Sequence, residues 1–291
     1  MRDSGICEIV EALNRVGEIL TERNQPSLPK RMPREDTKAF VWESRGGFRP
    51  VHRPALIEPS LLVGIERQTK AFFDNVNRFL HELPAHEVLL WGERGTGKSS
   101  LVRSLLVAFQ EKNLALLEIP EAYTQDLPMI LNILEKDPRK WILYLDDFAF
   151  QHPGDHYREL KVLLDGGLAA KPANTLTVAT SNRRHLMREA FPNENEIHPE
   201  ETVAETMSLA DRFGLSLGFY SFDQATYMAA VARHLEALGI TLADNWEKEA
   251  LKWAMTRGLR SGRVARQAAF ELAGQKKLID DFYAEKNEEL S

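Results

Sequence analysis

The sequence contains only one cysteine, Cys7, among its 291 residues. A single thiol excludes an internal disulfide framework and a thiolate metal cluster, and it suits a reducing compartment. No stretch approaches the roughly 18 consecutive apolar residues of a membrane-spanning helix. The first 20 residues carry interspersed charges rather than the uninterrupted apolar core of a signal peptide. These absences predict a cytoplasmic protein with no membrane partner.

An excess of positive charge is also missing, because the formal net charge is −6 and the pI is about 5.8. This balance argues against a strongly basic nucleic-acid binder but leaves a local basic groove open. Hydrophobic residues make up 43% of the chain and charged residues 27%. Such a composition is typical of a soluble globular protein, and the length allows one large or two medium domains.

One stretch, Leu89–Arg103 (LLWGERGTGKSSLVR), joins an apolar run to a glycine-rich loop and the start of a helix. Gly92, Gly97, Lys98 and Ser99 match the pattern G-x-x-x-x-G-K-[ST]. A loop nearly free of side chains lets backbone N–H groups converge on a polyphosphate, and the helix N-terminus adds partial positive charge. The lysine is placed to reach the β and γ phosphates, and the serine to ligate Mg²⁺. The alternative, a chance glycine-rich turn, is expected in about one chain in a hundred of this size.

Two carboxylates follow a buried strand that is predicted for Trp141–Leu145, WILYL. A phosphoryl-transfer site needs one carboxylate to orient Mg²⁺ and another group to activate the attacking water. We expect Asp146 to fill the first role and Asp147 the second. The alternative is that Asp147 only caps the following turn.

The order of elements predicts an α/β fold with a parallel sheet between two layers of helices. Strands are predicted at Glu87–Trp91, Leu114–Ile119, Trp141–Leu145, Thr175–Thr180 and Leu215–Phe219. Helices between them are predicted at Ile65–Leu80, Ser99–Gln110, Leu127–Glu135 and Tyr157–Leu164. The segment Ala39–Pro59 shows no regular pattern.

The two ends of the chain differ from this central region. Apolar residues recur every three or four positions over Gly5–Arg23, which predicts an amphipathic helix. Three prolines indicate a linker at Gln25–Asp36. The helix either packs on the main body or docks on a partner or neighbouring subunit. Only helices are predicted after Ser221, at Phe222–Leu238, Asn245–Thr256 and Gly262–Leu278, with a frayed end at Glu285–Ser291. The expected domains are therefore 1–36, 37–221 and 222–291.

Five segments in this order, GERGTGKSS, WILYLDD, TVATSN, SLADRFGL and RSGRVARQ, resemble an AAA+ ATPase. Longer segments, LLWGERGTGKSSLVRSLL, YRELKVLLDGG, ATSNRRHL and SLADRFGLSLGF, more closely resemble the bacterial ATP-binding family known as domain of unknown function 815. The resemblance covers about Leu61–Leu278. It implies a P-loop NTPase domain of AAA+ type, followed by a small all-helical lid.

The resemblance also implies roles for individual residues. Gly92–Ser99 would be the Walker A loop and Asp146 the Walker B metal carboxylate. Asn182 would be sensor 1, Arg212 an arginine finger acting on a neighbouring subunit, and Arg263 sensor 2. Lys98 and Asp147 complete the expected catalytic set. The expected nucleotide contacts are Leu62, Val63, Gly64 and Ile65, which would lie against adenine, and Gly92, Glu93, Arg94, Gly95, Thr96, Gly97, Lys98, Ser99 and Ser100.

Each of these roles has a simpler alternative. Asn182 could end its strand in a turn, and Arg212 could pair with the aspartate before it. The fixed fork of donors on arginine suits phosphate and supports the finger. Arg263 lies in a basic cluster, any member of which could be the sensor: Arg257, Arg260 and Arg266. Asp147 stands where most hydrolysing AAA+ proteins have glutamate, one methylene longer, so the rate of hydrolysis is open.

The sequence thus predicts an AAA+ ATPase that binds Mg·ATP and hydrolyses it with the help of a neighbouring protomer in a homo-oligomer. Hydrolysis would move the lid and remodel an unidentified protein partner. Two alternatives stay open. One is an ATP-dependent switch that does not hydrolyse, for which Asp147 is the best support. The other is a loader ATPase associated with nucleic acid, suggested by Arg183, Arg184 and the cluster Arg257–Arg266.

Overall fold

The computed structural model describes residues 37–44, 47–148, 164, 171–182, 211–241 and 245–289, with only the backbone for 278–289. Several predictions lie outside these residues. They are the N-terminal helix Gly5–Arg23, the linker Gln25–Asp36, nearly all of the helix Tyr157–Leu164, and the pair Arg183 and Arg184.

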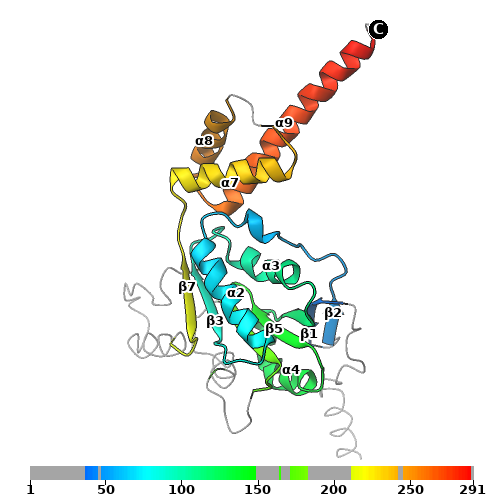
Figure 1. Cartoon of the computed structure of the whole chain (residues 1–291), viewed down its shortest axis with the longest axis vertical. Helices are drawn as coiled ribbons and strands as arrows, with labels where there is room; N and C mark the ends of the chain where they lie inside the picture. Colours follow the sequence, from blue (N-terminus) through cyan, green and yellow to red (C-terminus); the bar gives the residue numbers. More distant parts are fainter. Residues whose placement is uncertain are drawn as a thin grey trace, which may run out of the picture.

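A seven-stranded sheet forms the centre of the molecule, in the order β2-β1-β4-β5-β6-β3-β7 (Figure 1). All neighbouring strands are parallel except β1 and β2. The strands are β1 Ala39–Glu43, β2 Gly47–Pro50, β3 Val88–Gly92, β4 Leu114–Glu118, β5 Lys140–Leu145, β6 Thr175–Ser181 and β7 Leu215–Phe219. The five predicted strands are present, and their carboxyl ends meet at one edge because they run in parallel.

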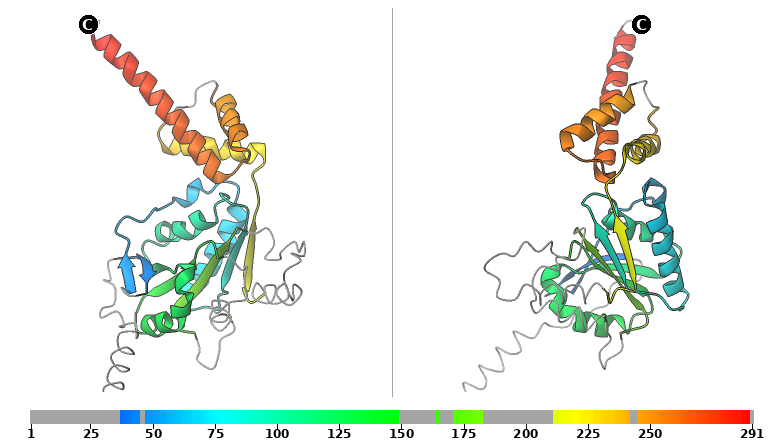
Figure 2. Two further views of the ribbon diagram at one scale, coloured as in Figure 1. Left: turned by 180° about the vertical axis from the view of Figure 1, so that it is seen from behind. Right: turned by 90° about the vertical axis from the view of Figure 1, so that its left-hand side faces the viewer.

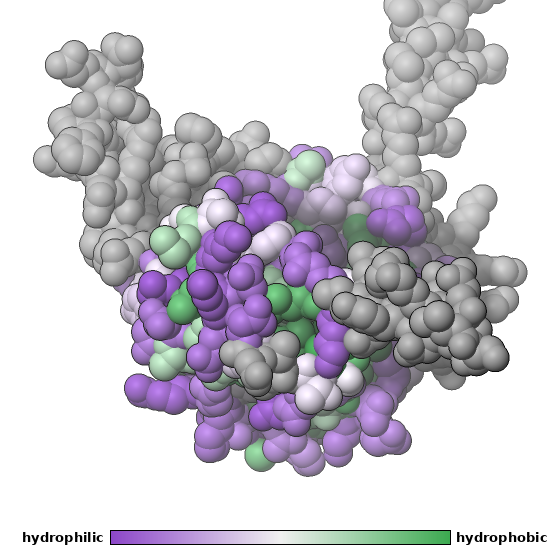
Figure 3. Space-filling model, turned by 90° about the horizontal axis from the view of Figure 1, so that it is seen from above, coloured by the Kyte–Doolittle hydropathy of each residue, from purple (hydrophilic) through white to green (hydrophobic). Residues whose placement is uncertain are grey.

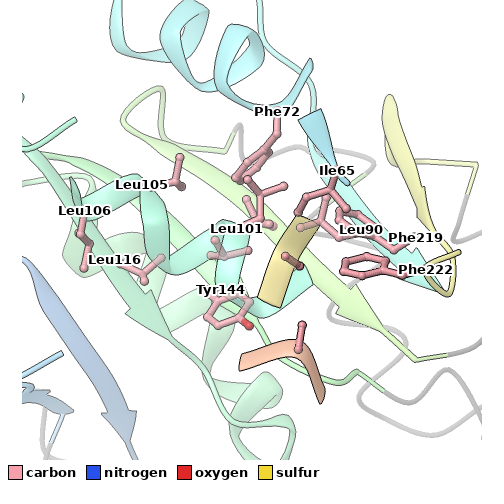
Figure 4. Close-up of a cluster of buried hydrophobic side chains, with 14 of the residues drawn as sticks. Ile65, Phe72, Leu90, Leu101, Leu105, Leu106, Leu116, Tyr144, Phe219 and Phe222 are labelled. Carbon is pink, nitrogen blue, oxygen red and sulfur yellow. The ribbon is translucent and has the colours of Figure 1, made fainter. Parts of the chain in front are cut away.

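Helices cover both faces of the sheet, because successive residues of a strand point to opposite sides. In β5, Ile142 and Tyr144 belong to one buried cluster, and Leu143 and Leu145 belong to the other. The first cluster includes residues of α2 (Glu66–Leu80) and α3 (Lys98–Ala108), some of which Figure 4 shows against β3 and β5. The second includes residues of α4 (Leu127–Leu134). Two short 3₁₀ helices, η1 (Pro59–Leu61) and η2 (Glu121–Asp126), precede α2 and α4.

The hairpin β1–β2 corrects the expectation of an irregular segment at Ala39–Pro59. The strand β1 adds to the edge of the sheet beside β4, and β2 pairs with it in antiparallel fashion. Phe40 and Trp42 point into the second cluster, and the indole N–H of Trp42 donates to Asp126 Oδ2 at 2.8 Å. These contacts come from residues far away in the sequence, so the local pattern does not reveal the strands.

Three helices form the lid: α7 (Gln224–Ala237), α8 (Trp246–Arg257) and α9 (Gly262–Glu289). The hydroxyl of Tyr227 on α7 donates to the carbonyl of Ala250 on α8 at 2.9 Å, and the small residues Ala265, Ala268 and Ala269 of α9 are buried. The lid lies beyond one end of the sheet, and α9 points away from it (Figure 2). This helix continues to Glu289, so the prediction of a helix ending at Leu278 was wrong.

The face that is seen from above in Figure 3 is mostly hydrophilic, and hydrophobic side chains gather in a recess near its centre. Within the described ranges, every helix is too short or too polar to span a lipid bilayer.

Candidate nucleotide-binding site

The glycine-rich loop follows β3 directly and leads into α3, as predicted. Gly92 has φ +129°, and a Cβ atom there would lie 2.0 Å from the carbonyl oxygen of Phe219 in β7. Gly97 has φ +110° and immediately precedes α3. Both positions therefore require glycine, because other residues rarely adopt this backbone conformation and a side chain at Gly92 has no space.

Lys98 begins α3 and is only 5% exposed. Its Nζ atom donates to the carbonyl oxygens of Gly92 at 2.9 Å and Glu93 at 2.7 Å. Burial lowers the pKa of this lysine from 10.5 to about 8, although Asp147 and Asp146 act in the opposite direction. The ammonium group is thus poorly solvated and held by carbonyl dipoles, which is a suitable arrangement for a group that binds phosphate.

A chain of hydrogen bonds connects α3 with the ends of β5 and β6. The hydroxyl of Ser99 donates to Asp146 Oδ1 at 2.8 Å, and the hydroxyl of Thr180 donates to the same atom at 2.7 Å. The Thr180 oxygen also accepts from the backbone N–H of Asp147 at 2.8 Å, and Asn182 Nδ2 donates to Asp147 Oδ1. One buried threonine hydroxyl therefore links the carboxylate of Asp146 with the backbone of Asp147.

Asp147 has further features that fix its position. Its φ is +52°, a left-handed conformation that is uncommon for residues other than glycine. Arg94 of the glycine-rich loop lies with its guanidinium 3.8 Å from Asp147 Oδ2. Both side chains are more than half exposed, so this ion pair contributes little to stability. The ion pair does place the positive charge of Arg94 beside Asp147, the predicted general base.

A cavity of about 440 Å³ opens beside these groups. Of the predicted site residues, those that line it are Leu62, Val63, Ile65, Arg94, Gly95, Thr96, Gly97, Lys98, Ser99, Ser100, Asp146, Asp147, Asn182 and Arg263. The lid closes one side of it, because the backbone N–H of Arg263 at the start of α9 donates to the carbonyl of Gly95 at 3.0 Å. The structure thus brings together the loop, the two aspartates, Asn182 and Arg263.

Four predicted residues do not line the cavity. Gly92 and Glu93 instead supply the carbonyls that hold Lys98. Gly64 has φ +82° and approaches the lid, where an added Cβ would lie 2.2 Å from Thr226 Cγ2. Arg212 precedes β7, whose first residue Leu215 pairs with Val88 at the start of β3. It therefore lies at the opposite edge of the sheet from the loop of its own chain.

Several residues of the site were not predicted. Thr180 lies two positions before Asn182, and only the pairing of β5 with β6 reveals its place between the aspartates. Arg103 lines the cavity one turn after Ser99, and its Nε atom donates to the Ser99 carbonyl at 3.1 Å. The spacing of four residues on α3 could have indicated it. The lid and the segments before α2 and α7 contribute Ile57, Leu61, Phe222, Ala230, His234 and Gly262. Arg266, which the sequence offered as an alternative to Arg263 for the sensor, also lines the cavity.

Another carboxylate lies near the aspartates. Burial and the neighbouring Asp146 raise the pKa of Glu118 at the end of β4, while Arg103 and Arg49 lower it. In the described part of the chain, no group of three or more histidine, cysteine, aspartate or glutamate side chains is arranged to hold a metal ion.

The sequence profile of one family, described as "Protein of unknown function (DUF815)", matches residues 35–276. The chain belongs to this family. The match covers the sheet, the glycine-rich loop and most of the lid, in agreement with the predicted resemblance. No curated protein matches the sequence of this DUF815 member.

Among solved structures, RuvB of Thermotoga maritima, described as a Holliday junction branch migration motor, aligns with a TM-score of 0.54 and 14% identity. The alignment covers 77% of this chain and 66% of that one, slightly less than two thirds of its length. A single-residue variant of the same RuvB aligns with a TM-score of 0.54 and 15% identity, over 77% and 68% of the two chains. At this identity the likeness concerns the fold alone, which is the AAA+ P-loop NTPase fold, with a helical lid after the sheet.

Proposed function

We propose that this protein is an ATPase that binds Mg·ATP in the cavity between the sheet and the lid. The observation that carries this proposal is the hydrogen-bonded chain from Ser99 through Asp146, Thr180 and Asp147 to Asn182, beside the buried Lys98. The chain joins a hydroxyl and two carboxylates at the carboxyl edge of the sheet, where α/β folds bind ligands. We also propose that the domain boundary lies near residue 221, between 37–221 and 222–291, after an N-terminal arm of 1–36.

The residues present suit a nucleotide with a metal ion. The glycine-rich loop offers backbone N–H groups at the start of α3, and Lys98 would neutralise the phosphates. Ser99 and Asp146 would hold Mg²⁺, which supplies positive charge for the transferred phosphoryl group. Leu62, Val63 and Ile65 would lie against the adenine.

Asp147 is the proposed base for the attacking water, and Asn182 positions it. The amide of Asn182 donates to one carboxylate oxygen, so the other oxygen is directed toward Arg94 at 3.8 Å. Arg263 would contact the phosphates from the lid, since it lines the cavity and its backbone is bonded to Gly95. In this scheme hydrolysis would move the lid relative to the sheet and act on a partner protein.

We further propose that Arg212 acts on a nucleotide bound by a neighbouring protomer. The strands β3 and β7 run side by side from Val88 and Leu215 to Gly92 and Phe219. These four residue steps along the strands span about 13 Å, so Leu215 lies about this far from the loop. Arg212 comes three residues before Leu215 and is therefore farther still from the loop. This position supports action in trans, and with it a homo-oligomer whose sites lie between subunits.

The test is ATP turnover per protomer, measured with Mg²⁺ as the protein concentration rises. A rate that climbs with concentration is expected, and Lys98→Ala should abolish it. Lys112→Ala is the matched control, because this lysine is exposed and lies outside the cavity. Arg212→Ala should keep ATP binding but lose turnover, and mixing it with Lys98→Ala protein should restore part of the rate. Unchanged turnover in Lys98→Ala would refute the proposal.

A second candidate, an ATP-dependent switch without hydrolysis, is favoured by one observation. The carboxylate of Asp147 already has Asn182 on one oxygen and Arg94 near the other. A short side chain held in this way could fail to reach a water on the γ-phosphate. The switch predicts tight ATP binding with no turnover at any protein concentration. The loader for nucleic acid stays a prediction, and DNA band shifts at low salt would test it.

A further inference from the structure

Two of the three residues that follow Arg212 are tied to the sheet. The side chain of Phe213 is only 4% exposed and belongs to the second buried cluster. Leu215, the first residue of β7, donates its backbone N–H to the carbonyl of Glu87 at 3.1 Å. The backbone that carries Arg212 is therefore fixed on its carboxyl-terminal side.

Gly214, the third of these residues, lies against His86. A Cβ atom at Gly214 would lie 2.4 Å from Nδ1, 2.8 Å from Cγ and 3.0 Å from Cβ of the histidine. Favourable contacts between carbon atoms begin at about 3.5 Å, so a side chain here would force the two segments apart by about 1 Å. Only glycine allows the backbone to approach the imidazole so closely.

His86 is itself held in place, because its backbone is bonded twice to Asn75 of α2. Asn75 is fully buried. Its side-chain amide donates to the His86 carbonyl at 2.8 Å, and its side-chain oxygen accepts from the His86 N–H at 3.0 Å. The next residue is also tied to the sheet, since the carboxylate of Glu87 accepts from the backbone N–H of Thr177 in β6 at 2.5 Å. The Cβ atom of His86 is therefore fixed, and its ring supports the backbone of Gly214.

We propose that His86 is a positioning residue for Arg212, and that it sets the point from which the guanidinium reaches the nucleotide of a neighbouring protomer. This inference rests on the proposed function, in which Arg212 acts in trans. A shift of about 1 Å in a group that acts on the reacting atoms can lower the rate about 100-fold. His86 lies before β3 and outside the cavity of its own chain. Its replacement should therefore affect turnover and leave ATP binding intact.

The first experiment measures kcat and the Kd of ATP for Gly214→Ala, His86→Ala and the double variant. The added methyl group displaces the chain next to Arg212, so the kcat of Gly214→Ala should fall about 10- to 100-fold with an unchanged Kd. His86→Ala alone should lower kcat less, since it removes the support without a collision. In the double variant only Cβ at 3.0 Å remains near the methyl group, so most of the lost turnover should return. Gly274→Ala is the control, because a Cβ there meets nothing within 4 Å.

Mixed protomers show whether the change acts through Arg212. In a mixture of two single variants, Lys98→Ala protein supplies Arg212, and Arg212→Ala protein supplies the intact nucleotide site. Adding Gly214→Ala to the Lys98→Ala chain should remove most of the restored rate. Adding it to the Arg212→Ala chain should leave that rate unchanged. A general loss of stability would lower the rate in both cases.

Three outcomes overturn the inference: unchanged turnover in Gly214→Ala, no recovery in the double variant, or equal losses from the two mixtures. Thermal unfolding shows whether Gly214→Ala folds. If it does not, His86→Ala is placed in the Lys98→Ala chain for the same comparison, because this change adds no atoms. If mixing the single variants restores no rate at all, the proposed action of Arg212 in trans is itself refuted. That result is distinct from equal losses of a rate that mixing does restore.

Discussion

Thr180 offers the sharpest test of how the two aspartates are held. The substitution Thr180→Val keeps the shape of the side chain but removes a hydroxyl that donates to Asp146 at 2.7 Å and accepts from the Asp147 N–H at 2.8 Å. A hydrogen bond to a charged group contributes about 1.5–3 kcal/mol, and an N–H left without its partner costs about 1–3 kcal/mol. Asp146 and Asp147 are exposed, so water compensates in part. We expect a net destabilisation of about 2–4 kcal/mol.

Thermal unfolding without nucleotide, followed by circular dichroism, measures this effect. For a chain of this size, 1 kcal/mol changes Tm by about 2–4 °C, so Thr180→Val should lower Tm by about 4–16 °C. Thr177→Val is the matched control on the same strand. Thr177 is also fully buried, but its hydroxyl has no partner among the described residues, so valine should leave Tm unchanged or raise it. Equal Tm changes in the two variants would refute the role of the Thr180 hydroxyl.

Two further predictions concern the glycine-rich loop. Gly92→Ala should destabilise the protein by more than about 3 kcal/mol in urea unfolding, since the Cβ would collide with the Phe219 carbonyl, whereas Gly239→Ala, which has φ +69° but open space, should cost about 1 kcal/mol. Similar costs would contradict the close approach at Gly92. ATP affinity should fall as the pH rises above 8, because the free protein then loses the Lys98 proton that bound phosphate requires. Calorimetry above that pH, in buffers of different ionisation enthalpy, should show uptake of a proton, and its absence would refute the assigned pKa.

The positions of the glycine-rich loop and of the two aspartates could be predicted because the loop motif is local and because parallel strands bring their ends together. Asp146 directly follows β5, and Asn182 directly follows β6. Because these neighbouring strands are parallel, their carboxyl ends lie at the same edge of the sheet. The sequence motif contains the loop glycines, and their positive φ angles in the structure explain why glycine is needed there. Local pattern and tertiary structure agree at these positions.

The remaining features depend on contacts that no local pattern contains. Thr180 gains its role only from the register in which β5 and β6 pair. The strand β1 is short, and the indole N–H of Trp42 donates a hydrogen bond to Asp126, which lies 84 residues later in the sequence. His234 lies in an ordinary amphipathic helix, and only the docking of the lid on the sheet brings it to the cavity. Tertiary contacts rather than propensity decide these positions.

The same backbone segment connects the proposed phosphate site with the lid. The carbonyls of Gly92 and Glu93 hold Lys98, and the Glu93 N–H donates to Phe219, the last residue of β7 before the lid. The Glu93 carboxylate accepts from Ser221 in that connection, and the Gly95 carbonyl accepts from Arg263 at the start of α9. A phosphate that draws Lys98 away from these carbonyls would release the peptide groups on which the lid is anchored. We therefore expect nucleotide binding to change the position of α9 through the loop itself, without requiring direct contact between phosphate and lid.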